Sequence, residues 1–395
     1  MKNRIAPELR ELHHFKICYS KDHYCGHPRQ SGLFNYGNGE LILMHSHAPC
    51  RYQVPDDISH SFTTGYASRA QIRLQRSFSY GETWSAEHEV VVWDESLPLE
   101  EKRAVLYRAD EAGVARAQLD LDGPDAAVYF ARPATGQAGT DGQPAFECFA
   151  FRSGDRGRTW EAVPTRVRGP EGRYVHRDGH PLVRFPDGTL MGAMSVAVQG
   201  ATGAVAVYGS DDSGLTWEYL AEVARDPTGG GRPTYAGLLL LPDGQLQCYM
   251  LNIGGIRNAL QLALSDDGGY SWSAPRPIVA WGQSPWAGRR RPEAARPEVH
   301  YRSPWPMRLR DGRIAVLFAR RKPPSGIGLI LSEDQGESWS AEAIVRDDGS
   351  GWDLGYPVAT QLEDGRIFTA YYFMEEDGNP FGGTRHIAGS FFRLP

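Results

Sequence analysis

The feature that most constrains this fold is an eight-residue pattern, Ser-x-Asp-x-Gly-x-(Thr/Ser)-Trp, that recurs along a chain of 395 residues. Full copies begin at Ser153, Ser210, Ser265 and Ser332, and a degenerate copy begins at Ser77, with Ser79 in place of the Asp. In a tight turn the Ser and Asp side chains satisfy backbone groups, Gly adopts positive φ, and Trp buries its ring against a sheet. The pattern therefore predicts a repeated hairpin, and we assign its residues to folding rather than to chemistry.

A second series of turns alternates with the first. Each is an Asn-Gly or Asp-Gly pair between apolar runs: Asn38-Gly39, Asp122-Gly123, Asp187-Gly188, Asp243-Gly244, Asp311-Gly312 and Asp364-Gly365. Such pairs are the strongest short-range signal of a hairpin. Six units with two hairpins each, repeated radially, predict an all-β fold: a six-bladed β-propeller of four-stranded antiparallel blades.

We expect one propeller domain over residues 1–395, nearly without helix. The blades are expected at approximately 20–97, 98–170, 171–226, 227–292, 293–348 and 349–395. The sixth unit lacks the second turn, and the N-terminal run from Leu12 to Tyr19 is expected to supply its outer strand. This pairing would close the ring.

The composition and charge of the chain exclude some classes of binding partner. The formal net charge is −6 and the isoelectric point is near 6.1, which argues against binding nucleic acid or an anionic membrane. No apolar stretch approaches a membrane span, and the first 18 residues lack the apolar segment of a secretory signal. Five cysteines are too few for a disulfide framework. These observations favour a cytoplasmic protein, with a mature secreted form as the alternative.

Candidate functional residues follow from the geometry of a propeller, whose inner strands begin at one end of the central channel. Residues about ten positions before each hairpin Gly should converge there, together with those about seven after it. They are rich in Arg, His and Tyr, which suit a carboxylate ligand and proton transfer. We expect His27, His47, Tyr235 and Tyr356 to be catalytic, and Arg29, Arg232, Arg302, His180, Asp178, Asp353 and Tyr301 to bind substrate.

The turns and the six-bladed arrangement resemble the sialidase (neuraminidase) superfamily, whose repeats are called Asp-boxes. Arg29 stands ten residues before Gly39, as the first carboxylate-binding Arg does in that family, and Tyr301-Arg302-Ser303-Pro304 is similar to the motif of its third Arg. Gly355-Tyr356-Pro357 lies in the frame of the family's nucleophilic Tyr. The resemblance implies that Arg29 and Arg302 grip a substrate carboxylate beside Tyr356.

Three positions depart from the family pattern. Tyr235 stands where the family has the Glu that activates its nucleophile, and Leu251-Asn252 stands where it has the second Arg. The acid/base Asp falls near Tyr66, and Asp57, in the same loop, is the candidate to replace it. A Tyr without a carboxylate partner is a poor nucleophile at its ordinary pKa of about 10.

Three functions remain open. The first, slightly favoured, is a sialidase-like exo-glycosidase that cleaves an acidic oligosaccharide or polysaccharide. The second is a lyase that splits a uronate glycan by β-elimination, with Arg neutralising the carboxylate and His or Tyr moving protons. The third is a glycan-binding propeller without activity.

No cofactor is expected, although two groups of residues have the right chemistry for metals. Cys25, His27, His45, His47 and Cys50 crowd two neighbouring strands and offer zinc ligands, but without a second Cys-x-x-Cys. Asp211-Asp212 and Asp266-Asp267 look like calcium ligands but lie inside the Ser/Asp/Trp turns, so we interpret them as structural.

Overall fold

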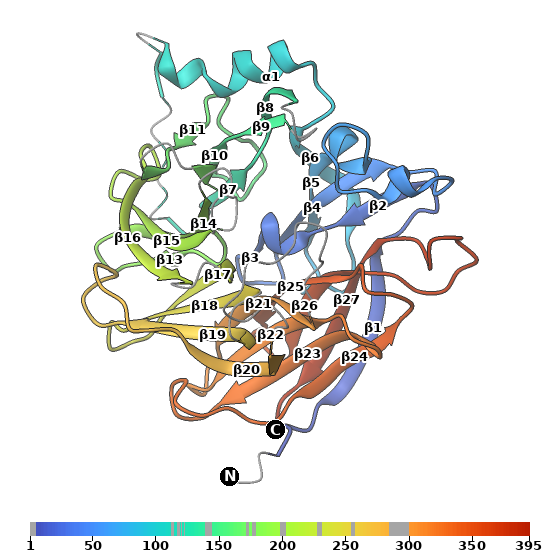
Figure 1. The fold of residues 1–395 in the computed structure, drawn as a ribbon, viewed down its shortest axis with the longest axis vertical. Helices are drawn as coiled ribbons and strands as arrows, with labels where there is room; N and C mark the ends of the chain where they lie inside the picture. Colours follow the sequence, from blue (N-terminus) through green and yellow to red (C-terminus); the bar gives the residue numbers. More distant parts are fainter. Residues whose placement is uncertain are drawn as a thin grey trace.

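The computed structural model describes residues 5–395 except 112–113, 117–118, 120, 122, 139–143, 171–173, 176–178, 198–202, 227–230, 254–256 and 284–299. Six antiparallel sheets follow one another around a central axis (Figure 1). The predicted all-β, six-bladed propeller is therefore confirmed. The Asp122 turn of the second blade lies outside the described residues.

The first three blades depart from the expected four strands, since blades one and three each form a five-stranded sheet among the described residues. In order across the sheet, blade one contains β2 (His23–Gly26), β4 (Leu41–Pro49), β5 (Gln71–Ser77) and β6 (Ser85–Asp94), with β3 (Leu33–Asn35) also paired to β4. Blade two contains β7 (Ala127–Ala131), β10 (Cys148–Ser153) and β11 (Thr165–Val167). Blade three contains β12 (Tyr174–Val175), β14 (Leu190–Ala197), β15 (Ala204–Ser210) and β16 (Glu218–Arg225), with β13 (Val183–Arg184) also paired to β14. In the described part of the chain the second blade thus has three strands. A separate hairpin of β8 (Ala134–Ala138) and β9 (Pro144–Phe146) lies beside it.

The last three blades have the expected four strands each. They are β17 (Arg232–Leu240), β18 (Leu246–Ile253), β19 (Arg257–Ser265) and β20 (Arg276–Gln283); β21 (Tyr301–Arg308), β22 (Ile314–Arg320), β23 (Ser325–Ser332) and β24 (Ala343–Gly349); and β25 (Gly355–Gln361), β26 (Ile367–Phe373), β27 (His386–Arg393) and β1 (Arg10–Cys18). β1 pairs antiparallel with β27, from Arg10 opposite Arg393 to Cys18 opposite Ile387. The N-terminal strand completes the last blade, as the sequence predicts.

Helices are short. Among the described residues the α-helix α1 (Leu99–Leu106) covers the edge of the second blade, and four 3₁₀ turns lie in loops: η1 (Pro28–Gln30), η2 (Pro55–Ile58), η3 (Tyr66–Arg69) and η4 (Arg108–Asp110). None of the helices that the structure describes is long and apolar enough to cross a membrane.

The Ser/Asp/Trp turns have the bonding that their sequence predicts. In the copy that begins at Ser153, the Ser hydroxyl accepts the Gly157 N–H at 2.8 Å, and the Asp155 carboxylate accepts the Thr159 N–H at 2.9 Å and its hydroxyl at 2.6 Å. Gly157 has φ of 74°, and a Cβ there would lie 2.5 Å from a methyl of Leu74 in the first blade. The turn therefore needs glycine both for its backbone and for contact with the neighbouring blade.

The degenerate turn keeps these contacts with a hydroxyl in place of the carboxylate, and its Ser77 hydroxyl accepts the Gly81 N–H at 2.9 Å. The Ser79 hydroxyl accepts the Thr83 N–H at 2.9 Å, where a full copy has a carboxylate oxygen. The same Ser79 hydroxyl lies 2.7 Å from the Thr83 hydroxyl, so it also replaces the contact that the second carboxylate oxygen makes in a full copy.

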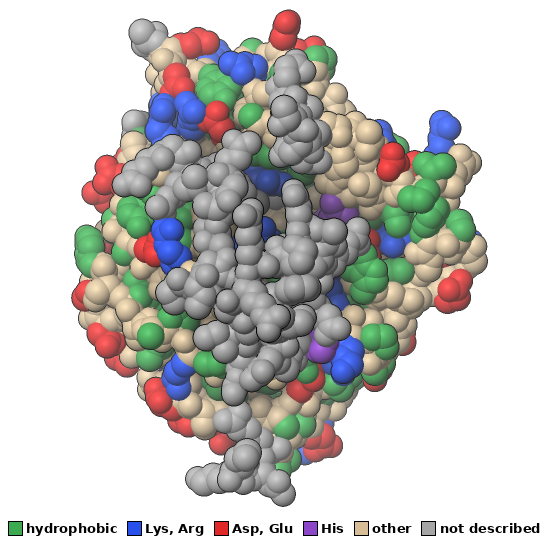
Figure 2. Space-filling view, viewed as in Figure 1, with side chains coloured by type: hydrophobic (Ala, Val, Ile, Leu, Met, Phe, Trp, Pro, Cys, Tyr) green, Lys and Arg blue, Asp and Glu red, His purple; other side chains and the backbone are tan. Residues whose placement is uncertain are grey.

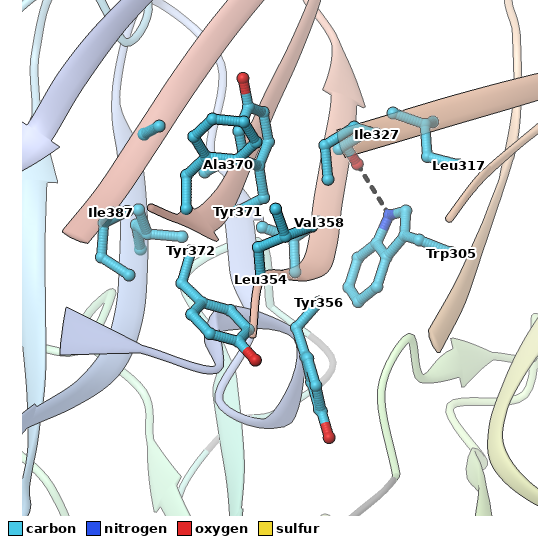
Figure 3. Packing of buried hydrophobic residues seen from close by; sticks show 14 of the residues in the cluster. Trp305, Leu317, Ile327, Leu354, Tyr356, Val358, Ala370, Tyr371, Tyr372 and Ile387 are labelled. Atoms are coloured by element: carbon cyan, nitrogen blue, oxygen red, sulfur yellow. Dashed lines mark hydrogen bonds between the residues drawn. The ribbon is translucent and has the colours of Figure 1, made fainter. Parts of the chain in front are cut away.

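The hydrophobic core is divided among the contacts between neighbouring blades, with a separate buried cluster at most of them. Figure 3 shows the contact between blades five and six, where the Trp305 indole donates to the Ala359 carbonyl at 3.0 Å. In the same view the hydroxyls of Tyr356 and Tyr372 point away from the aliphatic side chains. The rings of these two tyrosines thus belong to the core, whereas their hydroxyls face the polar site described next.

Candidate functional site

A cavity of about 170 Å³ opens at the end of the channel where the inner strands begin. Its lining comes from blades one, two, four, five and six: His27, Gln30, Ser46, His60, Phe62, Tyr66, Ala67, Ala70, Ile72, Trp93, Glu95, Tyr129, Arg132, Pro133, Tyr235, Arg302 and Tyr356. Arg or Lys and His side chains are visible at the centre of this face in Figure 2. The cavity therefore combines cations, imidazoles and phenols.

Three inner strands bend where they reach the cavity. The pairing of β17, β21 and β25 shifts register around Tyr235, Ser303 and Tyr356, and these residues have φ of 53°, 57° and 53°. Each stands nine residues before the Gly of its hairpin turn. A non-glycine residue in this backbone region costs roughly 1–3 kcal/mol, and such residues cluster at functional sites. Here the bulges accompany side chains that line the cavity.

Tyr235, Tyr356 and Arg302 form one hydrogen-bonded group. The Tyr356 hydroxyl donates to the Tyr235 hydroxyl at 2.8 Å, and the Arg302 guanidinium donates to the same Tyr235 oxygen. The Arg302 guanidinium also lies 4.6 Å from the centre of the Tyr235 ring and 5.5 Å from that of Tyr356. Two phenols from blades four and six are thus held against a cation from blade five.

Burial raises the pKa of Tyr356 above its ordinary value, although Arg302 and Arg321 act in the opposite direction. Burial also disfavours the charged form of Arg302, but its contacts with Tyr235 and Tyr356 outweigh this and raise its pKa. Near neutral pH the group therefore consists of a neutral Tyr356 phenol, able to donate a proton, beside a permanent cation.

The opposite side of the cavity is built from the first blade. The Tyr66 hydroxyl lies 3.2 Å from His27 Nδ1, and the Tyr66 ring stacks on Tyr24 with centroids 3.7 Å apart. The His27 ring meets the Tyr356 ring edge to face at 4.8 Å. The His27–Tyr66 pair is therefore in direct contact with the Tyr235–Tyr356–Arg302 group.

Asp353 is buried behind the aromatic side chains that form this wall of the cavity, and it binds two of their neighbours. Its carboxylate accepts from the hydroxyls of Tyr372 at 2.9 Å and Tyr24 at 3.1 Å, and from Arg385 Nε at 3.0 Å. His60 Nε2 lies 3.5 Å away. Burial opposes ionisation, but the bond to His60 and the charges of His60 and Arg385 hold the pKa of Asp353 well below its usual range. Asp353, predicted to bind substrate, is placed instead as an ionised support for the tyrosines.

Glu95 is the one carboxylate among the described residues that line the cavity. It is fully engaged: Lys102 Nζ lies 2.7 Å from one oxygen, the Trp93 indole donates to the other at 2.9 Å, and the Ala134 N–H donates at 3.0 Å. Both oxygens of this carboxylate are thus already bonded to protein groups.

Arg29 does not line the cavity. Its side chain is fully buried and donates to the main-chain carbonyls of Pro304 at 3.1 Å, Tyr235 at 2.8 Å and Ala236 at 2.7 Å. This placement favours a structural role, in which Arg29 of blade one holds β17 and β21 in position, over the predicted grip on a substrate carboxylate.

The other predicted residues are placed away from the cavity lining. His180 is buried between Phe34 and Phe130, and burial together with the charge of Arg29 lowers its pKa to about 4. The Tyr301 hydroxyl donates to Glu342 at 3.0 Å.

Three more of the predicted site residues lie outside the cavity lining. Arg232 is exposed at the start of β17, and the Asp57 carboxylate accepts the N–H groups of Gln53 and Val54 within its own loop. The His47 ring packs on His23 with centroids 4.4 Å apart. Asp178 lies outside the described residues.

The sequence prediction missed several lining residues, chiefly His60, Phe62 and Tyr66 as members of the site. All three lie in the connection between β4 and β5, residues 50–70, which contains η2 and η3. The sequence did carry a signal, because this connection is far longer than a hairpin turn and contains three aromatic residues and one His. Glu95, which follows β6, gave no such signal.

These features define the chain as a six-bladed propeller with a site of tyrosines, histidines and arginines at one end of its channel. Residues 71–369 match the model of the BNR repeat-like domain family, so the chain belongs to that family. No curated protein is similar enough in sequence to be matched.

Solved structures share the fold. A protein of unknown function from Dyadobacter fermentans has a TM-score of 0.68 at 20% identity, over 98% of this chain and 100% of that one. The Hadza microbial sialidase Hz136 has a TM-score of 0.60 at 17% identity, over 96% of this chain and 68% of that one. A Trypanosoma rangeli sialidase gives 0.56 at 12% identity, over 96% and 59%. The predicted likeness to the sialidase superfamily is confirmed at the level of the propeller fold.

Proposed function

We propose that this protein is a carbohydrate-active enzyme that cleaves a glycan at a carboxylate-bearing sugar, and that it does so by β-elimination. The observation that carries the proposal is the contact between two proton-transferring groups in one cavity, His27–Tyr66 and Tyr235–Tyr356, with Arg302 hydrogen-bonded to the Tyr235 phenol. Arg132 lines the same cavity. The two arginines supply the positive charge that an acidic sugar requires.

The groups fit the steps of an elimination on a uronate. Arg302 binds the carboxylate and stabilises the negative charge that develops when the C5 proton leaves. His27 accepts that proton, because imidazole is the side chain whose ordinary pKa lies nearest neutral pH. The electron pair of the C5–H bond forms the C4–C5 double bond, and the C4–O4 bond breaks. Tyr356, kept protonated by its raised pKa, donates a proton to the departing O4.

Sialidase-like hydrolysis is the second candidate, and one observation favours it. Tyr356 lies against Arg302 in the frames that resemble the nucleophilic Tyr and third Arg of sialidases, and several structures that share the fold are named as sialidases. The nearest hydrogen-bond partner of Tyr356 is the phenol of Tyr235 and not a carboxylate. A phenol with a raised pKa and no carboxylate base is a weak nucleophile, so this arrangement supports elimination better than hydrolysis.

One experiment separates the candidates. The protein is incubated with sialyl and uronate oligosaccharides, and both released sugar and the ultraviolet absorbance of a conjugated double bond are followed. Rising absorbance with a uronate substrate supports elimination, whereas free sialic acid without it supports hydrolysis. Binding of either glycan without any product would support the third possibility, a non-catalytic glycan-binding propeller.

Matched variants tie the activity to the cavity. His27→Asn should abolish most turnover by a lyase, and Tyr356→Phe should depress the chemical step while sparing binding. Tyr301→Phe is the control, because its hydroxyl bonds to Glu342 outside the cavity. Equal activity in all three variants would place the active site elsewhere.

A further inference from the structure

A cluster of soft metal ligands lies apart from the cavity. One ligand atom each from Cys18, Cys25 and His47 lie within 4.8 Å of one another, and the two sulfur atoms are 3.4 Å apart. None of the three residues lines the cavity. The proposed function gives this cluster no role.

The three residues come from different elements. Cys18 ends β1, the N-terminal strand that completes the last blade, whereas Cys25 and His47 lie opposite each other on β2 and β4 of the first blade. Cys25 is fully buried, Cys18 is partly buried, and the His47 side chain is 8% exposed. The cluster therefore lies where the last blade meets the first.

The separation of the two sulfur atoms fits zinc, and the three side chains would fill three of its four positions. With Zn–S bonds of about 2.3 Å, two sulfur ligands of a tetrahedral Zn²⁺ stand roughly 3.8 Å apart, close to the separation found here. His47 Nδ1 is buried and has no hydrogen-bond partner in the described part of the chain. His45 lies on the same face of β4 two residues earlier.

The charge balance also suits a buried site. A bare divalent cation would be costly to bury, but two thiolates cancel its charge. Thiolate and imidazole are the ligands that select zinc over magnesium or calcium. Two cysteines and a histidine on three strands therefore suit zinc and do not suit a hard cation.

We propose that Cys18, Cys25 and His47 bind a structural Zn²⁺ that fastens the last blade to the first. The ion joins Cys18 of β1 to Cys25 and His47 of blade one, across a junction that the chain between β1 and β2 and the hydrogen bond from the Cys25 N–H to the Arg385 carbonyl at 3.0 Å already hold. Because the three ligands meet only when β1 packs against β2 and β4 and not in the unfolded chain, binding of the metal stabilises the folded state of this junction.

The test is the metal content of the full chain, purified from zinc-supplemented cells without chelator. We expect one equivalent of zinc by elemental mass spectrometry, at least a tenfold loss in Cys18→Ser and in His47→Gln, and no loss in the control Cys248→Ser, whose buried thiol lies in blade four. Replacement by Co²⁺ should give a thiolate charge-transfer band in the wild type and lose it in Cys18→Ser. Circular dichroism checks that each variant is folded.

A chelator supplies the second readout. It should lower the melting temperature of the wild type and leave that of Cys18→Ser unchanged. Absence of zinc together with absence of the cobalt band would overturn the proposal, as would zinc retained in both ligand variants. So would a count of three reactive thiols in the unreduced, chelator-treated and denatured wild type in place of five, because it would mean that Cys18 and Cys25 form a disulfide.

Discussion

The Asp353→Asn variant tests whether the wall of the cavity depends on one buried charge. The substitution keeps the shape of the side chain and one acceptor oxygen but removes the negative charge. Arg385, whose side chain is 4% exposed, would then lack its partner at 3.0 Å, and one of the two tyrosine hydroxyls that the carboxylate binds would lose its acceptor. The variant therefore leaves a buried cation without a counter-charge.

The expected cost follows from that geometry. Removing one partner of a buried ion pair costs about 3–5 kcal/mol, and because Asn retains one acceptor we expect about 3 kcal/mol in the free energy of unfolding at pH 7. The pKa of Asp353 is held well below its usual range in the folded protein. Its contribution is thus fully present above the unfolded pKa of about 4 and is lost as the pH falls through the folded value.

Urea unfolding of the wild type and the variant measures both effects. The difference should be present near pH 7 and should shrink below about pH 4. Asp57→Asn is the control, since that carboxylate accepts two backbone N–H groups in a loop and should cost no more than about 1 kcal/mol. A cost below about 1 kcal/mol for Asp353→Asn, or a difference that ignores pH, would refute the reasoning.

Three further predictions concern other parts of the molecule. Tyr356→Phe removes the hydrogen bond to Tyr235 and should lower kcat on the acidic glycan at least tenfold with little change in KM; steady-state kinetics would contradict this if KM alone rose. Asp155→Ala removes acceptors of the Thr159 N–H and hydroxyl and should cost about 1–2 kcal/mol, with activity per folded molecule unchanged. His180 is buried with a pKa of about 4, so the folded state binds fewer protons than the unfolded chain and stability should fall as the pH drops from about 6.5 toward 4; in His180→Gln a thermal melting series should lose that part of the slope, and an unchanged slope would count against the assignment.

The fold could be predicted because each turn is determined by a few consecutive residues. Glycines and turn-forming side chains fix each hairpin, and the hairpins fix the register of the strands. Counting back from Gly244 and Gly365 therefore found Tyr235 and Tyr356, which the structure places in one hydrogen-bonded group. The same counting found Arg302 beside them.

Counting residues from the hairpin glycines cannot predict the direction of a side chain or the path of a long loop. Arg29 stands at the expected spacing, but a three-residue 3₁₀ turn and full burial direct its guanidinium to backbone carbonyls. His60 and Tyr66 belong to a connection without repeats, so no register relates them to the channel. Asp353 shows a third limit, because its four partners come from different segments of the first and last blades and their meeting depends on closure of the ring.

The pairing of β1 with β27 joins residues nearly the whole chain length apart. Loop-closure entropy makes such a contact slow to form, so the last blade should be completed late in folding, after the intervening blades. A permuted chain that begins between two blades would make β1 and β27 neighbours joined by a short linker. The entropic cost of closing the ring would then fall on the new pair of termini. The refolding rate of such a permutant, compared with that of the wild type, would show how much of the folding barrier comes from the pairing of β1 with β27.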